Sequence, residues 1–317
     1  MLRECAPRLL AQRRLSQSAI PALARDADAV REIESLLPTL PTTHEMRLGD
    51  ARNLDEIPAA SVHLILTSPP YWTLKNYNRH EAQLGAIEEY DVFLAELDRV
   101  WRQCFRILVP GGRLICVVGD VCLSRRKNAG RHTVVPLHAS IQEHCRRIGF
   151  DNLAPIIWYK IANASLEAGG NGNGFLGKPY EPNAVIKNDI EFILMERKPG
   201  AYRNPGVSER VFSVIPQQLH SVWFRQIWSD IPGASTRAHP APYPLDLAVR
   251  LIRMFSFVGD TVFDPFLGSG TTCLAAWQTG RNSLGMEIDR EYLAVAEKRF
   301  RRHSERLTSR HVLRVVR

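Results

Sequence analysis

A short run of residues, Thr67-Ser68-Pro69-Pro70-Tyr71-Trp72, combines groups that could bind and activate an amine. The Ser68 hydroxyl and the Pro69 carbonyl are hydrogen-bond acceptors, and the two prolines stiffen them because each ring fixes its own φ. Acceptors that are fixed in advance can draw the protons of an amino group without reorganising. Tyr71 and Trp72 add flat rings that could stack on a planar ligand. The alternative is a strand terminator with aromatic rings packed behind it.

A second run, Asp264-Pro265-Phe266-Leu267-Gly268-Ser269-Gly270-Thr271-Thr272, follows a predicted strand and opens a predicted helix. Gly268 and Gly270 let a ligand approach the backbone, and the N–H groups of the new helix can hold an anionic group. Glu287 ends the next predicted strand about 20 residues later, where a carboxylate can bind ribose hydroxyls. No Lys-Ser or Lys-Thr pair follows the glycines, which argues against nucleotide hydrolysis. The alternative is a turn that is tight only for packing.

Alternating strand and helix patterns predict a parallel α/β sheet that positions both runs. Predicted strands are Val62–Leu66, Arg113–Val118, Leu153–Tyr159, Ile190–Met195, Thr261–Phe263 and Ser283–Ile288, and predicted helices are Tyr90–Leu108, Val134–Ile148, Tyr243–Phe257, Gly270–Gln278 and one from Arg290. The two prolines end the first strand, so the hexapeptide lies at a carboxyl tip. Ligands bind at this edge of α/β sheets, and we expect the glycine turn at a neighbouring tip.

Composition narrows the class of protein. With 45% hydrophobic and 23% charged residues the chain is typical of globular proteins, and no stretch approaches the ~18 apolar residues of a membrane span. The net charge of +8 favours a polyanionic partner, although a basic protein need not bind one. Six cysteines without CxxC spacing predict no metal site and a reducing, cytoplasmic location. The Arg-rich first 25 residues make organellar targeting a weaker alternative.

The hexapeptide resembles the catalytic motif of the amino-group DNA methyltransferases, in which Ser or Asp-Pro-Pro-Tyr follows a strand. The glycine turn resembles their S-adenosylmethionine loop, and Gly49-Asp50-Ala51-Arg52 resembles their cofactor-adenine site. The catalytic motif precedes the cofactor loop, which is the order of the circularly permuted β class. The likeness runs from about Leu48 to Phe300 and leaves out the first 40 residues and residues 197–230. It includes Trp158-Tyr159-Lys160 and His239-Pro240-Ala241-Pro242-Tyr243-Pro244.

This resemblance implies a Rossmann-like fold with a mostly parallel seven-stranded sheet, helices on both faces and S-adenosylmethionine as cofactor. The implied catalytic residues are Ser68, Pro69, Pro70, Tyr71 and Trp72. The implied cofactor residues are Asp50, Ala51, Thr67, Asp264, Pro265, Phe266, Gly268, Ser269, Gly270, Thr271, Thr272, Glu287, His239 and Tyr243. Asp50 would accept a hydrogen from the cofactor's adenine, Asp264 would contact its ammonium, and the two threonines would contact its carboxylate. Asp264 could instead be a turn residue.

Composition, charge and the resemblance together predict four parts in the chain. Residues 1–40 form a basic arm or helix, and residues 41–196 form a catalytic half with a flexible loop at 161–183. Residues 197–238 form a target-recognition insertion, and residues 239–317 form the cofactor half with a basic terminal helix.

The implied reaction transfers a methyl group to an exocyclic amino group of a base flipped out of double-stranded DNA. Cytosine N4 is favoured because serine at the first motif position is commoner in the enzymes that act on cytosine, and adenine N6 is the second choice. Methylation of an RNA base or a protein amide, and an inactive DNA-binding protein, are further alternatives. The family also implies a homodimer, and the sequence leaves open a restriction endonuclease partner.

Candidate DNA contacts fall into two groups. Basic residues after strand ends would bind phosphates, or would simply be solvated: Lys75, Arg79, Arg125, Arg126, Lys127 and Arg131. Residues of the irregular insertion would read or wedge into DNA, or would pack in the core: Trp223, Arg225 and Trp228.

Overall fold

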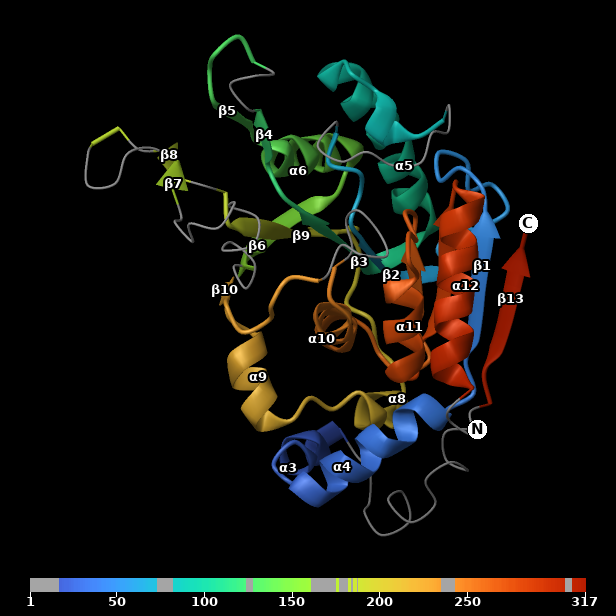
Figure 1. Ribbon diagram of the computed structural model, residues 1–317. Helices are drawn as coiled ribbons and strands as arrows, with labels where there is room; N and C mark the ends of the chain where they lie inside the picture. Colours follow the sequence, from blue (N-terminus) through green and yellow to red (C-terminus); the bar gives the residue numbers. More distant parts are fainter. Residues whose placement is uncertain are drawn as a thin grey trace.

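The central feature of the fold is one twisted sheet, seen in a computed structural model (Figure 1). The structure describes residues 17–72, 82–123, 128–160, 175–176, 182–183, 185–186, 188–234, 243–305 and 310–317. Within these residues the sheet has nine strands in the order β10-β6-β9-β3-β2-β11-β12-β1-β13. Their bounds are β1 (Thr43–Leu48), β2 (Val62–Thr67), β3 (Leu108–Val118), β6 (Asp151–Tyr159), β9 (Ile190–Arg197), β10 (Ile227–Trp228), β11 (Thr261–Asp264), β12 (Asn282–Glu287) and β13 (Val312–Val316).

Neighbouring strands are parallel except at β9, which runs antiparallel to β3 and to β6. The predicted mostly parallel α/β sheet is therefore confirmed. The predicted number of seven strands is too low for the described chain, because β10 and β13 extend the sheet at its two edges. Each adds only a short segment, with two residues in β10 and five in β13, so neither leaves a clear periodic pattern.

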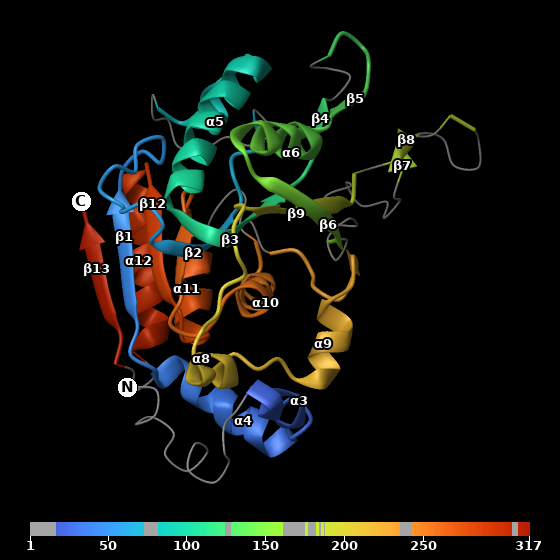
Figure 2. The ribbon, with the colours of Figure 1, turned by 180° about the vertical axis from the view of Figure 1, so that it is seen from behind.

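Helices cover both faces of the sheet. Helices α10 (Leu245–Phe255), α11 (Thr271–Gln278) and α12 (Arg290–Ser304) cover the face seen in Figure 1. Helices α5 (Tyr90–Ile107) and α6 (Leu137–Ile148) cover the opposite face, which Figure 2 brings forward. The alternation along β3 supplies both sides, since Leu114 and Cys116 pack under α5 and α6 while Ile115 and Val117 pack under α10. The side chains that alternate along the strand thus form one buried apolar layer on each face of the sheet.

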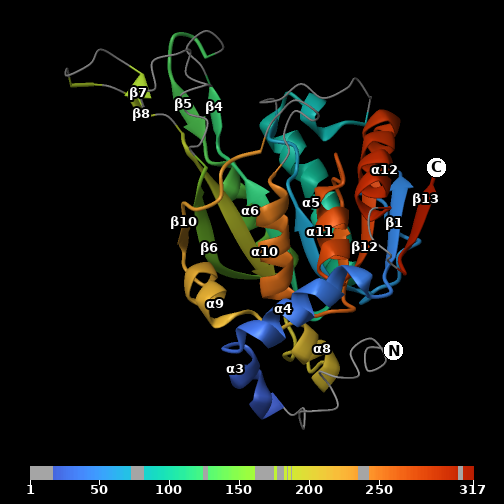
Figure 3. The ribbon, with the colours of Figure 1, turned by 60° about the horizontal axis from the view of Figure 1, so that its bottom comes forward.

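Short helices gather at the amino ends of the strands. There α3 (Ile20–Leu23) and α4 (Ala27–Leu36) pack against α8 (Val207–Phe212) in one apolar cluster (Figure 3). The remaining helical segments are α9 (Gln217–Trp223), η1 (Gln17–Ala19), η2 (Leu37–Thr39) and η4 (Leu84–Ala86). Two small hairpins project at the other end of the molecule (Figure 3): β4 (Val121–Leu123) with β5 (Thr133–Val135), and β7 (Phe175–Leu176) with β8 (Val185–Ile186). In the part of the chain that the structure describes, no helix has the length and apolar character to cross a membrane.

A carboxyl group is buried in the core on β9. Glu196 has no exposed surface, and neither carboxyl oxygen has a hydrogen-bond partner within 3.5 Å among the described residues. Burial raises the pKa of Glu196 to about 8, and the nearby Gln142 amide on α6 offsets this only in part. The folded protein therefore holds Glu196 protonated at neutral pH.

This burial predicts a pH-dependent stability. The pKa of Glu196 is about 4.5 in the unfolded chain and about 8 in the folded protein, so folding takes up a proton between pH 4.5 and pH 8. The free energy of unfolding should therefore fall as pH rises through that window. We expect Glu196→Gln to match the parent near pH 4 and to exceed it by up to several kcal/mol near pH 9, since a tenfold change in proton binding is about 1.4 kcal/mol. Urea unfolding at several pH values measures this difference. Glu32→Gln, at an exposed position of α4, is the control and should show no such trend.

Candidate active site

The two chemical motifs meet because β2 and β11 are neighbours. The strands run parallel, with Val262 opposite Leu64 and Phe263 opposite Ile65. Their carboxyl ends therefore lie side by side, as expected. The Thr67 hydroxyl at the end of β2 donates a 2.7 Å hydrogen bond to Oδ1 of Asp264 at the end of β11. Both residues are buried, so this bond joins the hexapeptide to the glycine turn beneath the surface.

A pocket opens above this junction. Its empty space is about 630 Å³, which includes space open to solvent. Eight residues proposed from the sequence line it: Asp50, Ala51, Ser68, Pro70, Pro265, Phe266, Gly268 and Glu287. Eight others were not proposed: Gly49, Ala82, Gln83, Leu84, Val100, Met286, Ile288 and Tyr292. The hexapeptide and the glycine turn thus share one cavity.

The Ser68 hydroxyl is oriented by its neighbours. Ser68 donates a 3.2 Å hydrogen bond to the Tyr71 hydroxyl, which donates in turn to the Val117 carbonyl at 3.3 Å. Because the Ser68 proton is directed at Tyr71, the lone pairs of its oxygen stay free to accept a hydrogen from a ligand. Ser68 is half-buried and lines the pocket, so it can reach such a ligand.

The aromatic residues of the hexapeptide differ from the expectation that they stack on a base. Tyr71 is only 7% exposed and packs in the core, so little of its ring is free for stacking. Trp72 contacts Tyr90 edge-on, with ring centroids 5.0 Å apart, and its indole N–H donates to the Glu88 carbonyl. Trp72 also has a φ of +47°, a left-handed conformation that is strained for a tryptophan. In this arrangement both rings hold the strand tip in place.

Glycine shapes the second wall of the pocket. Gly268 has a φ of +51° and Gly270 a φ of +77°, and the Gly268 N–H donates a 2.7 Å hydrogen bond to Glu287. The other oxygen of Glu287 accepts from the Asp289 N–H at 3.0 Å. Burial raises the pKa of Glu287 to about 7 despite these two bonds. The carboxylate is thus held from behind while it faces the pocket.

Asp264 has a different role from the expected one. It is 1% exposed and is not part of the pocket lining. Its carboxylate accepts hydrogen bonds from Thr67, the Phe266 N–H, Thr272 and Tyr243. Burial raises its pKa, and these donors partly offset the effect. Asp264 therefore lies beneath the pocket, where it links several elements.

The threonines of the glycine turn are also occupied. Thr272 has no exposed surface, and its hydroxyl donates to Asp264 and lies 3.3 Å from the Leu66 carbonyl. The Thr271 hydroxyl accepts a 2.8 Å hydrogen bond from Arg299 of α12, which also donates to Ser269. Thr272 is therefore engaged beneath the pocket, whereas the Thr271 hydroxyl accepts from Arg299 and keeps its own proton. Sequence reasoning missed Arg299, because only the packing of α12 against α11 brings it to the turn.

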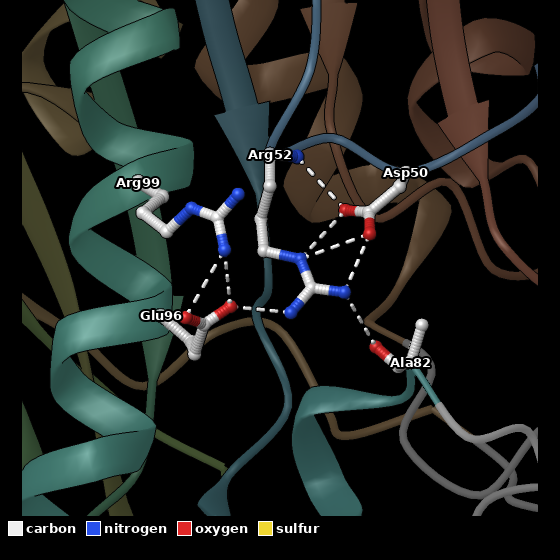
Figure 4. Close-up of polar contacts among 5 residues, drawn as sticks. All are labelled: Asp50, Arg52, Ala82, Glu96 and Arg99. Carbon is white, nitrogen blue, oxygen red and sulfur yellow. Dashed lines mark hydrogen bonds and ion pairs between the residues drawn. The ribbon is translucent and has the colours of Figure 1, made fainter.

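Asp50 comes from the turn after β1 and lies on the pocket wall. Both of its carboxylate oxygens accept hydrogen bonds from the Arg52 guanidinium, and Oδ1 also accepts from the Arg52 N–H at 2.9 Å (Figure 4). Burial alone would raise the pKa of Asp50, but the bonds and charge of Arg52 outweigh it and lower that pKa. Asp50 therefore faces the pocket as an ionised acceptor.

The predicted DNA contacts have mixed outcomes. Trp223 is 7% and Trp228 1% exposed, and the Arg250 guanidinium lies 5.6 Å and 4.6 Å from their ring centroids. This burial agrees with the alternative that the two tryptophans pack in the core. Arg225 and Arg131 are exposed, and Arg131 lies in the turn between β4 and β5. The remaining candidates lie outside the described residues, as does His239: Lys75, Arg79, Arg125, Arg126 and Lys127.

Two of the pocket residues that were not predicted could have been found from the sequence. Ile288 directly follows Glu287, and Tyr292 lies in the first turn of the next helix, so the rule that strand ends bind ligands could have found both. Ala82, Gln83 and Leu84 have no comparable signal. Tyr243 was proposed for the pocket, but its buried hydroxyl instead contacts Thr272 and Asp264.

A bulky side chain at Gly268 should abolish cofactor binding. Gly268→Val adds two obstacles, a left-handed backbone that costs roughly 1–2 kcal/mol and a branched side chain at the pocket wall. Calorimetry should then detect no S-adenosylmethionine binding at concentrations that saturate the parent. Gly259→Val is the matched control, because Gly259 has a φ of +84° with open space around its Cβ position. Normal affinity in Gly268→Val would refute the assignment of this turn.

Comparison with known proteins agrees with the geometry. Residues 62–298 match the family of N6/N4 DNA methylases. The type II methyltransferase M.MjaI of Methanocaldococcus jannaschii is 36% identical, covering 81% of this chain and 91% of that protein. The DNA adenine methyltransferase YhdJ of Escherichia coli is 30% identical, covering 79% and 80%.

A solved structure is also similar. The putative DNA modification methylase TTHA0409 of Thermus thermophilus, complexed with S-adenosyl-L-methionine, superposes with a TM-score of 0.71. It is 51% identical, covering 86% of this chain and 98% of that one. The joined strand tips, the shared pocket and these similarities lead to one conclusion: the chain belongs to the N6/N4 family of S-adenosylmethionine-dependent DNA methyltransferases.

Proposed function

We propose that this protein methylates the N4 amino group of cytosine in double-stranded DNA. The observation that carries the proposal is the position of Ser68 and Gly268 on one pocket, above the bond between Thr67 and Asp264. A methyl donor at the glycine turn and an amine at Ser68 would then be neighbours. Holding two reactants in this way is the main contribution an enzyme can make to a direct displacement.

The pocket suits the proposed cofactor. Asp50 presents acceptors that match the amino group of an adenine, and Glu287 presents acceptors that match ribose hydroxyls. Phe266, Met286 and Ile288 add apolar surface for a flat ring. Bound S-adenosylmethionine supplies an activated methyl group on a positively charged sulfur. The residues of the chain bind it and keep it in line with the amine.

Ser68 is suited to accept a hydrogen from the target amine. The lone pair of an exocyclic amino group is delocalised into the base, so the nitrogen must be drawn toward tetrahedral geometry before it attacks. The Ser68 oxygen, whose own proton is directed at Tyr71, and the Pro69 carbonyl would accept the two amine hydrogens. A serine is too weak a base to take a proton at neutral pH, so we expect the proton to leave late, to water.

The choice of cytosine rests on Ser68. Within this family a serine at the first position of the motif is commoner among cytosine enzymes, and Ser68 occupies that position. YhdJ, named as an adenine methyltransferase, is a reason to keep adenine N6 as the second candidate. The net charge of +8 and the exposed Arg131 on the β4–β5 hairpin support a polyanionic substrate.

The target base can be identified directly. Unmethylated duplex DNA incubated with the protein and S-adenosylmethionine should yield N4-methyldeoxycytidine when its nucleosides are analysed by mass spectrometry. The Gly268→Val variant, which should not bind the cofactor, is the negative control. N6-methyldeoxyadenosine alone would contradict the choice of cytosine. Parallel incubations with RNA and with protein test the other acceptors, and methylation of RNA alone would exclude DNA as the substrate.

Ser68 should affect turnover and not cofactor affinity. Ser68→Ala removes an acceptor for the target amine but leaves the other walls of the pocket in place, so kcat should fall by about 10-fold or more while the Kd for S-adenosylmethionine stays within about 2-fold. Single-turnover kinetics and calorimetry measure the two quantities. Tyr71→Phe keeps Ser68 but removes the acceptor for its proton, and should lower kcat by a smaller factor. A large loss of cofactor affinity in Ser68→Ala would contradict this role.

A further inference from the structure

Arg52 is a mostly buried cation next to the pocket that the proposed reaction leaves without a role. Its side chain is 17% exposed and is not part of the pocket lining. Its guanidinium nevertheless contacts three separate segments, namely Asp50 after β1, Glu96 on α5 and the Ala82 carbonyl (Figure 4). Two of these, Asp50 and Ala82, belong to the pocket wall.

The contact with Asp50 is a fork. The Nε group of Arg52 lies 3.0 Å from Oδ1 and 2.9 Å from Oδ2, and a second guanidinium nitrogen also donates to Oδ2. A forked pair fixes the plane of a carboxylate, because rotation would break both bonds at once. The Asp50 side chain is still 38% exposed. One edge of the carboxylate is therefore held, and the group as a whole stays open to a ligand.

Arg52 is itself anchored on the side away from the pocket. Its Nη1 pairs with Glu96, and Arg99, one turn along α5, donates to both Glu96 oxygens at 3.2 Å and 3.1 Å. The pKa of Arg52 is raised, chiefly by its hydrogen bond to Asp50 and further by Glu96. The guanidinium is thus permanently charged and has two carboxylate partners in fixed directions. A lysine could supply the charge at this position but not the fork.

We propose that Arg52 is a positioning residue that aims the Asp50 carboxylate at the 6-amino group of the cofactor's adenine. Arg52 would then set the preference for adenine over a purine with oxygen at position 6, although the Arg52 side chain would contact neither base. An amino group donates to the aimed carboxylate, whereas a 6-oxo group faces it with another acceptor and cannot form this hydrogen bond. This inference rests on the proposed function, in which Asp50 binds the adenine.

The test compares two ligands that differ only at position 6. Calorimetry gives the Kd of the full-length protein for S-adenosylhomocysteine and for S-inosylhomocysteine, its 6-oxo counterpart. The parent should prefer the adenine compound by about 10-fold, because the 6-oxo compound loses one hydrogen bond to a charged acceptor. Asp50→Asn should abolish the preference. Arg52→Gln keeps Asp50 but loses the fork, and we expect the preference to fall to about 3-fold or less.

Two further variants separate positioning from charge and from general stability. Arg52→Lys keeps the positive charge without the fork, and the preference should be intermediate. Arg99→Gln removes a cation from the same network at Glu96, without a hydrogen bond to Asp50, and should leave the preference unchanged. Thermal unfolding of each variant shows that the protein is folded. If Arg52→Gln is unfolded, the ratio of the two Kd values measured for Arg52→Lys tests the proposal in its place.

The outcomes are distinct. If Arg52→Gln weakens both ligands by the same factor and the preference persists, Arg52 supports the fold only, and the proposal is wrong. If the parent shows no preference and Asp50→Asn has no effect, the assignment of Asp50 to the adenine fails, which is a failure of the proposed function. Loss of preference in both Asp50→Asn and Arg52→Gln, with Arg99→Gln unchanged, supports the proposal.

Discussion

The site depends on a buried carboxylate, Asp264, at the tip of β11. A carboxylate that is 1% exposed is unfavourable unless hydrogen-bond donors surround it. Here Thr67 comes from β2, Thr272 from α11 and Tyr243 from the segment before α10. These donors come from separate elements, so satisfying one carboxylate also brings together the strand tip that carries the catalytic motif and the turn that shapes the cofactor pocket.

The acids that face the pocket are stabilised in a related way. Two guanidinium nitrogens of Arg52 donate hydrogen bonds to the Asp50 carboxylate, and the N–H groups of Gly268 and Asp289 donate to the Glu287 carboxylate. Both carboxylates therefore have their orientation set by the protein before any ligand arrives. A site that is organised in advance loses less entropy when it binds its ligand. The same logic applies to Ser68, whose proton is directed away from the pocket by Tyr71.

The two ends of the sheet have separate roles. The carboxyl ends carry the pocket, and the β4–β5 and β7–β8 hairpins project at that end of the molecule (Figure 3). The amino ends carry the apolar cluster of α3, α4 and α8. Helix α8 belongs to the segment 197–238, and the tryptophans of that segment pack on Arg250. The exposed basic side chain of Arg131 lies on the hairpin that follows β3, and that of Arg225 lies in segment 197–238.

The alternating strands and helices, the mostly parallel sheet and the two motifs at strand ends can all be predicted from the sequence. These follow from local patterns, since burial of one helix face or one strand face leaves a period in the sequence. Of the carboxylates that face the pocket, Glu287 could be identified at a predicted strand end and Asp50 from the family resemblance. Contacts between distant segments settle which polar groups are open to a ligand. Asp264, Thr272 and Tyr243 have the right types for cofactor contacts, yet they are buried against partners from other elements. Arg299 and Arg52 gain their roles in the same way, because a charged side chain finds its partners through packing between elements, which leaves no periodic trace in the chain.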